Sequence, residues 1–554
     1  NSTGSVTVSE ASSLDLVGIN TASSADLDST AGVSDATADS VNVTGLLDVS
    51  GTSIALGSGT SVFNTGTLTF NSAGSVTVSE DSSLDLFGIN TAGSADLDST
   101  AGVSDTGAAS VDVSGLLDVS GTSIALGSGT SVFNAGALTF NSAGSVNIDE
   151  SSSMLVSGSS TAGAGLDLVS TDDVTLDASV TVVGDTSILA GTTVGGITVN
   201  AKLNGSGTIL LDAADEITIS AAIDPTTVTL NADDDITVTA AVVASELITV
   251  SAGEDGSGSF ILGAAGSLET TDSGSDITVT TGSTSGDITL AGTTTALDLV
   301  TMTTASGSIN GSGLVTSDTV DLNASSGIGN TTGITLSSSN ITADTTVGDV
   351  EIANSLGTAV SVSSLTTGAG SVSFSQSGGG DVSTSSVSAS VAVALSNAAG
   401  SLSLAGTVFA ASLDATATGA ITDGSNGDLA IAGLAEFTAD SLELGNDAGN
   451  ATNFGTLTFN STGSVTISED SSLDLVGTNT AGSASLVSVA GVSDALAASV
   501  NVTGLLDVSG TSIALGSGTS VFNTGTLTFS SAGSVTVSED SSLDLFGTNT
   551  AGSA

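Results

Sequence analysis

The chain has 554 residues, of which 58 are Asp or Glu and only one, Lys202, is Lys or Arg, so its formal net charge is −57. Without cations a chain cannot displace phosphate counterions or bind an anionic membrane surface, which excludes nucleic-acid binding and polybasic membrane contact. Cys and His are absent, and with them the commonest ligands and proton carriers of metal and acid–base chemistry. The 39% apolar content is enough to bury a core.

The first segment, residues 1–156, is an array of 70-residue repeats. The sequence GSVTVSE of residues 4–10 returns at residues 74–80, and a third copy begins at Gly144. Repetition at a fixed period indicates an array or a solenoid. The chain begins at a unit boundary and stops within a unit at Ala554, so we expect it to be a window of a longer protein.

Within one copy, apolar and polar residues alternate over short runs separated by Gly, Ser, Asn and Asp. This period-2 pattern in β-branched residues predicts short strands joined by turns. In the second copy the apolar residues of this alternation, which recur in the first copy, are Val76, Val78, Leu84, Leu86, Leu97, Val111, Val113, Leu117, Val119, Ile124, Leu126, Val132, Leu138 and Phe140.

The second segment, residues 157–430, loses the 70-residue identity but keeps the alternation, as in 174–176 (VTL), 197–199 (ITV) and 217–219 (ITI). In the third segment, residues 431–554, the 70-residue array resumes, with copies at Gly463 and Gly533. No linker or charge block separates the three segments, so we expect divergent coils continuous with the arrays on both sides. The longest apolar runs, such as residues 391–395, are too short for a membrane span.

These strands are too short and too closely spaced for a hairpin-based sandwich. We therefore predict an all-β fold, a right-handed parallel β-helix (β-solenoid). About nine strands in 70 residues correspond to three coils of three strands, or roughly 23 residues per coil, stacked at about 4.8 Å. One coil cannot bury its apolar side chains alone, so its stability comes from its neighbours.

The phrases at 307–314 (GSINGSGL), 320–329 (VDLNASSGIG) and 419–424 (GAITDG) resemble the repeats of filamentous-haemagglutinin-like proteins, the β-helical adhesins exported by two-partner (type V) secretion. The resemblance covers the whole chain in style. It implies export as an unfolded chain, folding outside the cell, and a role in adhesion or surface coating. Without Arg there is no Arg-Gly-Asp site, and without a basic patch there is no heparin-like glycan site. Acidic surface-layer and sheath proteins are equally compatible.

We predict no catalytic and no cofactor-binding residue. Lys202 is expected to face solvent rather than a low-dielectric pocket. The loop 57–60 (GSGT) lacks the Lys and helix of a phosphate loop and is interpreted as a turn. Phe63, Phe133 and Phe522 are interpreted as corner fillers.

The acidic turns are the candidate metal ligands, since Ca²⁺ binds carboxylate and carbonyl oxygens. The candidates are Asp172, Asp173, Asp233, Asp234 and Asp235. Diffuse condensation of cations on the acidic chain is the alternative to specific Ca²⁺ sites. Paired carboxylates also suit glycoside hydrolysis, although Trp and Tyr, which stack on sugars, are absent.

The sequence thus predicts a non-enzymatic extracellular structural protein that builds a cell-surface filament, sheath or coat by self-association. The alternatives are the stalk of a two-partner-secreted adhesin whose binding tip lies elsewhere, with surface glycans or cells as partners, and a carbohydrate-active β-helix.

Overall fold

The computed structural model describes residues 1–35, 40–495 and 497–554. Two compact units comprise Asn1–Gly282 and Ser283–Ala554, and their boundary lies inside the expected middle segment, residues 157–430. Among the described residues the regular structure is β-strand, apart from the 3-10 turn η1 (Gly424–Asn426). None of the helical structure in the described part of the chain is long and apolar enough to cross a membrane.

The first two copies of the repeat contribute β1 (Ser5–Glu10), β2 (Leu14–Leu16), β3 (Ile19–Ala22), β4 (Ser24–Ser29), β5 (Gly32–Asp35), β6 (Ser40–Gly51), β7 (Ser53–Leu56), β8 (Val62–Ser72), β9 (Ser75–Glu80), β10 (Leu84–Leu86), β11 (Ile89–Ala92), β12 (Ser94–Ser99), β13 (Gly102–Asp105), β14 (Ser110–Gly121), β15 (Ser123–Leu126) and β16 (Val132–Ser142). The rest of the first unit contributes β17 (Val146–Glu150), β18 (Met154–Val156), β19 (Ser160–Ala162), β20 (Leu166–Ser170), β21 (Val174–Leu176), β22 (Val180–Val182), β23 (Thr186–Ala190), β24 (Ile197–Val199), β25 (Leu203–Gly205), β26 (Thr208–Ala213), β27 (Ile217–Ile219), β28 (Ile223–Asp224), β29 (Thr227–Ala232), β30 (Ile236–Val238), β31 (Ala241–Ala244), β32 (Leu247–Ala252), β33 (Phe260–Leu262), β34 (Ser267–Thr270) and β35 (Asp276–Thr281).

The second unit contributes β36 (Ile288–Leu290), β37 (Thr293–Thr295), β38 (Leu299–Thr304), β39 (Ile309–Asn310), β40 (Leu314–Ala324), β41 (Ile334–Thr345), β42 (Val350–Asn354), β43 (Val360–Thr367), β44 (Val372–Gln376), β45 (Val382–Ala389), β46 (Ala392–Asn397), β47 (Leu402–Ala410), β48 (Ser412–Ala417), β49 (Ala420–Thr422), β50 (Asp428–Ala439), β51 (Ser441–Leu444), β52 (Thr452–Ser461), β53 (Ser464–Glu469), β54 (Leu473–Leu475), β55 (Thr478–Ala481), β56 (Ser483–Ser488), β57 (Gly491–Asp494), β58 (Ser499–Gly510), β59 (Ser512–Leu515), β60 (Val521–Ser531) and β61 (Val535–Val537).

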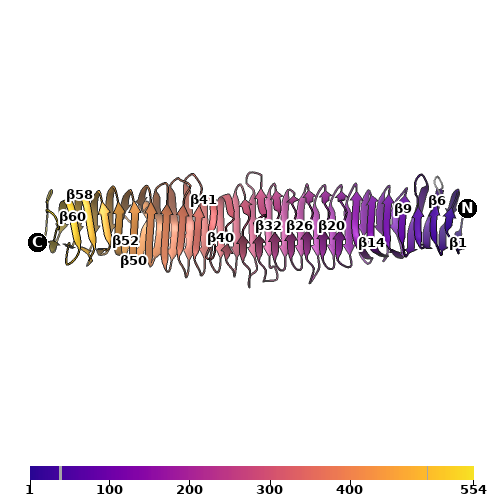
Figure 1. Cartoon of the computed structure of the whole chain (residues 1–554), viewed down its shortest axis with the longest axis horizontal. Coiled ribbons are helices and arrows are strands. Elements are labelled where there is room, and N and C mark those ends of the chain that lie inside the picture. Colours follow the sequence, from indigo (N-terminus) through magenta and orange to yellow (C-terminus); the bar gives the residue numbers. More distant parts are fainter. Residues whose placement is uncertain (36–39, 496) are drawn as a thin grey trace. The chain divides into compact units, whose positions relative to one another are not determined.

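Strands in both units pair in parallel with the strands one coil before and one coil after them, which makes each unit a β-solenoid. In the first unit β7 pairs with β5 and β9, and in the second β58 pairs with β56 and β60. Figure 1 shows this stacking, for example from β14 to β32 in the first unit. The predicted all-β, parallel solenoid is confirmed.

The core of each solenoid is built from side chains at every second position of the strands, which point inward as the alternation predicts. Columns of apolar side chains result, one residue per coil. In the first unit one such column runs Leu14, Val33, Ile54 and Val76, and the last three are about 1% exposed. Because each inward side chain packs on the coils above and below it, the stacking supplies the burial that one coil lacks.

The coil is shorter than the sequence suggested, at about 21 residues rather than 23. The column from Val6 shows the spacing, because Val6 pairs with Ala25, Ala25 with Leu47 and Leu47 with Leu68. Seventy residues therefore correspond to about three and one third coils of 21 residues, not three.

This mismatch turns each copy of the repeat relative to the previous one. Val6, in the first copy, belongs to the column of Leu47 and Leu68, whereas its equivalent Val76 pairs with Ile54 and Ala95. Successive copies start about one third of a turn further round the solenoid, so equivalent outward side chains face different sides.

Candidate functional site

Lys202 lies on the solenoid surface, in the turn between β24 and β25. Its Nζ atom is 3.9 Å from Oδ2 of Asp224, and the two side chains are 50% and 60% exposed. A half-exposed ammonium beside an exposed carboxylate is a weak surface ion pair. The expectation that Lys202 faces solvent is confirmed.

The predicted metal ligands lie at one corner of consecutive coils in the first unit. Backbone hydrogen bonds link Val174 N–H to the Gly196 carbonyl, Ile197 N–H to Glu216 and Ile217 N–H to Asp235, at 2.9 to 3.0 Å. Asp173, Glu216 and Asp235 therefore occupy equivalent corner positions, with Gly196 between the first two. The sequence did not reveal this alignment, because it depends on coil length.

The carboxylates of this corner are partly committed to the backbone. Oδ1 of Asp173 accepts the Gly196 N–H at 3.0 Å, and Oδ1 of Asp235 accepts the Ser259 N–H at 2.7 Å. Burial and the hydrogen-bonded Asp215 carboxyl raise the pKa of Asp234. Asp172 is exposed, and Asp233 is half-buried.

In the described part of the chain, no group of three or more carboxylates is placed to hold a metal ion. Specific Ca²⁺ binding by Asp172, Asp173, Asp233, Asp234 and Asp235 stays a prediction.

The other sequence features take the positions that the turn and core interpretations gave them. Gly57 and Gly59 have φ values of +74° and +71°, which fits the left-handed backbone of a tight turn. Phe63, Phe133 and Phe522 are fully buried.

A group that sequence reasoning missed is a buried glutamate in the repeat. Glu80 is 1% exposed, and its Oε1 accepts the Thr65 N–H at 2.9 Å and the Ser82 hydroxyl at 2.8 Å. Thr65 lies in β8, and past β9 the chain turns at residues 81–83 without forming a strand over it. The side chain of Glu80 therefore replaces the missing strand as the acceptor for this N–H.

The same hydrogen bonds recur in three further copies, in the last of which the half-buried Glu539 accepts the Thr524 N–H and the Ser541 hydroxyl at 2.9 Å. Glu150 accepts the Ala135 N–H at 2.7 Å and the Ser152 hydroxyl, and Glu469 accepts the Phe454 N–H at 2.7 Å and the Ser471 hydroxyl. We call each set, a buried Glu with the N–H one coil earlier and the Ser two residues later, a glutamate clasp. The signal was present in the sequence, since Glu80 continues the inward phase of Val76 and Val78.

The clasp glutamates titrate abnormally. Burial raises the pKa of Glu80, Glu150 and Glu469 from 4.5 to about 7 in each case, although the hydrogen bonds from Ser and the backbone oppose the shift. Desolvation disfavours the charged form of a carboxyl.

Asn90 supplies the acceptor for a second backbone N–H in the same copy of the repeat. Its side chain is fully buried, with Oδ1 accepting the Phe70 N–H at 3.0 Å and Nδ2 donating to the Phe87 carbonyl at 3.2 Å. Asn479 repeats both bonds in the second unit.

We expect Asn90→Ala to lower the free energy of unfolding by about 1–3 kcal/mol, because the buried Phe70 N–H would lose its acceptor. Chemical denaturation of the full chain measures the change. Asn71→Ala is the matched control, since Asn71 is exposed and should cost less than about 0.5 kcal/mol. Equal costs for the two variants would contradict this role of Asn90.

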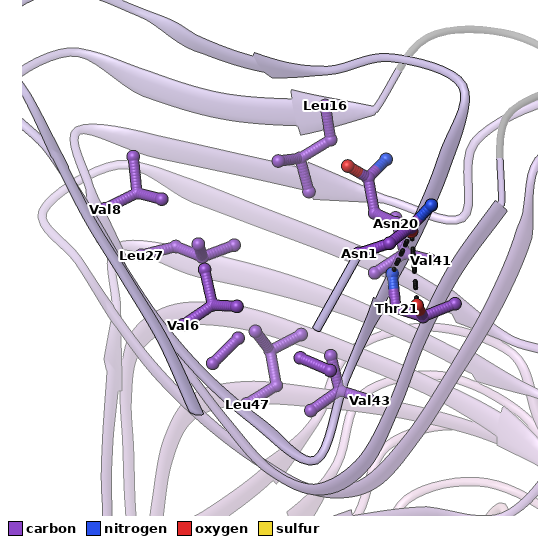
Figure 2. Close-up of a pocket in the computed structure, with 12 residues that line it drawn as sticks. Asn1, Val6, Val8, Leu16, Asn20, Thr21, Leu27, Val41, Val43 and Leu47 are labelled. Carbon is purple, nitrogen blue, oxygen red and sulfur yellow. Dashed lines mark hydrogen bonds between the residues drawn. The ribbon is translucent and has the colours of Figure 1, made fainter. Parts of the chain in front are cut away.

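The first coil of the first unit encloses a hollow of about 100 Å³ lined by Val6, Val8, Leu16, Leu27 and Leu47 among others. Figure 2 shows these apolar side chains, with Asn1 Oδ1 accepting the N–H and hydroxyl of Thr21 at 3.1 Å. The equivalents one copy later, Val76 and Val78, are fully buried core residues. The hollow is thus part of the core column rather than a polar binding site.

The chain is a repetitive parallel β-solenoid. At the corners of its coils, side chains accept hydrogen bonds from backbone N–H groups that have no strand partner. No protein-family model, no curated protein and no solved structure matches it. The resemblance to filamentous-haemagglutinin-like proteins stays a prediction.

Proposed function

We propose that this chain is a non-enzymatic extracellular structural protein whose solenoid units build a cell-surface filament, sheath or coat by self-association. The observation that carries the proposal is the one-third turn between successive copies of the repeat. It presents one set of outward groups on successive sides of the solenoid, so neighbours can be contacted from several directions.

Exposed apolar pairs are the groups that best suit such contacts. Val17 and Ile19 are 70% and 69% exposed in the first copy, and Phe87 and Ile89 are 44% and 68% exposed in the second. Each pair flanks a glycine at a bend between two strands, and the two pairs face different sides of the solenoid. Many weak contacts of one kind add through avidity when they are linked in a single chain.

Charge opposes this association. With a net charge of −57, two copies repel each other, and cations that condense on the chain weaken the repulsion. Outward carboxylates also stack directly, since Asp96 pairs in register with Asp118. Burial and the neighbouring Asp98 raise the pKa of both groups. Assembly is therefore expected to depend on cations.

Electron microscopy and sedimentation of the full chain, with millimolar Ca²⁺ and with chelator, test the proposal. We expect ordered fibres or sheets with Ca²⁺ and their loss on chelation or when Val17, Ile19, Phe87 and Ile89 are replaced by Ser. Val183→Ser with Val194→Ser is the matched control, since these residues are 58% and 60% exposed but lie outside the repeated pairs. Monomers under all conditions would refute self-association and favour the adhesin stalk.

A further inference from the structure

Each glutamate clasp leaves one carboxylate oxygen without a partner. The Oε2 atoms of Glu80, Glu150 and Glu469 are buried and accept no hydrogen bond from any described residue. No clasp has a cation to balance its charge, since the single basic side chain, Lys202, lies beside Asp224. A buried, unpaired carboxylate is costly, and the neutral acid is the form such a site favours.

The titratable groups around the clasps are all acidic. Asp81 raises the pKa of Glu80 by charge repulsion, and Asp470 and Asp474 do the same for Glu469.

The strands packed on each clasp add no positive charge. β7 and β8, against Glu80, carry no titratable residue, and the two aspartates of β12 are exposed. β15 and β16, against Glu150, carry none, and β20 contributes Asp167. For Glu469, β52 and β56 carry none, and β51 contributes the exposed Glu443. Among the described residues, no charged side chain around a clasp therefore stabilises its ionised form.

We propose that each glutamate clasp is a pH-sensitive closure of the solenoid, shut while its glutamic acid is neutral and released when the carboxyl ionises. In the neutral form Oε1 still accepts the N–H of the previous coil and the Ser hydroxyl. The ionised carboxylate is more stable in water than in the buried site, so the side chain moves out to solvent. The N–H of the previous coil then loses its acceptor, and the corner at residues 81–83, or its equivalent in the other copies, is no longer held.

The direction of the pH dependence follows from the difference between the closed and open states. In the closed clasp the glutamic acid has a pKa of about 7, whereas in the open state its pKa has the ordinary value of 4.5. Stability from the clasp is therefore fully present below pH 4.5 and is lost as the pH rises to about 7. The repeat arrays should be most stable in mild acid and least stable above neutral pH. A solenoid stabilised by paired carboxylates would show the reverse dependence on pH.

Hydrogen exchange of the clasp amides in the full chain measures this release directly. The amides of Thr65, Ala135 and Phe454 report the three clasps, after correction for the intrinsic pH dependence of exchange. We expect the protection of each to fall by roughly seventyfold between pH 5 and pH 8.5, as two-state linkage between pKa values of 4.5 and about 7 gives. The loss should level off above pH 7.5.

Two substitutions separate ionisation from a merely structural role. Glu80→Gln keeps the Oε1 acceptor but cannot ionise, so protection of Thr65 should become independent of pH while Ala135 in the same molecule stays pH-dependent. Ser82→Ala removes a hydrogen bond that lowers the pKa of Glu80, so the plateau for Thr65 should move to higher pH. Glu246→Gln is the matched control, because Glu246 is exposed and should change none of the three amides.

The proposal is overturned if protection at Thr65, Ala135 and Phe454 in the unsubstituted chain is the same at pH 5 and pH 8.5. It is also overturned if Glu80→Gln folds and leaves the pH dependence at Thr65 intact. If Glu80→Gln fails to fold, the shift of the plateau in Ser82→Ala and the pH dependence at Ala135 and Phe454 in that variant still test the proposal.

Discussion

Phe140→Ala is expected to lower the free energy of unfolding by about 3–5 kcal/mol, the range for removing a buried ring. The ring is fully buried in β16, one coil after Val119, with which Phe140 pairs in register. Because each coil contacts only its neighbours, the cavity should weaken the coils around β14 and β16 more than distant ones. Denaturant unfolding measures the total, and hydrogen exchange shows where it falls.

Phe87→Ala is the matched control for this prediction. It deletes the same ring from the same copy of the repeat, but Phe87 is 44% exposed. We expect a cost below about 1 kcal/mol, because nearly half of this side chain already contacts water. A similar loss in both variants would mean that the inward column does not supply the stability of the array.

Gly127→Ala is the second substitution with a large expected effect. Gly127 has a φ of +78°, and an added Cβ would lie 1.9 Å from the Asp149 carbonyl oxygen of the next coil. The left-handed backbone costs an alanine about 1–2 kcal/mol, and the forced separation of two coils adds about 1–3 kcal/mol. We therefore expect a total loss of about 2–5 kcal/mol, measured by denaturant unfolding.

Gly129 offers the control two residues away in the same loop. Its φ is +73°, and an added Cβ would meet nothing within 4 Å. Gly129→Ala should show the backbone cost alone, about 1–2 kcal/mol. If both variants lose the same amount, the close approach of the two coils at Gly127 is not a determinant of stability.

The Gly127 position also shows how the loop is held. Its N–H donates to Oδ2 of Asp105, one coil earlier, at 2.8 Å, and Asp35, Asp423 and Asp494 hold Gly57, Gly445 and Gly516 in the same way. The acidic residues of the repeat thus act in part as acceptors for backbone N–H groups at corners. This role of the acidic residues does not follow from the sequence pattern, which indicates surface charges or metal ligands.

The sequence by itself determined the parts of this structure that depend on local periodicity. Alternation such as Val76, Val78 specifies strands and their inward faces, because successive side chains of a strand point to opposite sides. The 70-residue repeat and the short spacing of the strands specified a parallel solenoid. These features need no knowledge of which coil lies above which.

Only the tertiary structure decided the features that depend on coil length. A coil of 21 residues, rather than 23, turns each copy by a third and aligns Asp173 with Glu216 and Asp235 at one corner. It also leaves the Thr65 N–H without a strand partner, so that Glu80, 15 residues later, must close it. The physical reason is that corner turns differ by a few residues in length, and those differences, summed along the chain, fix which groups meet across coils.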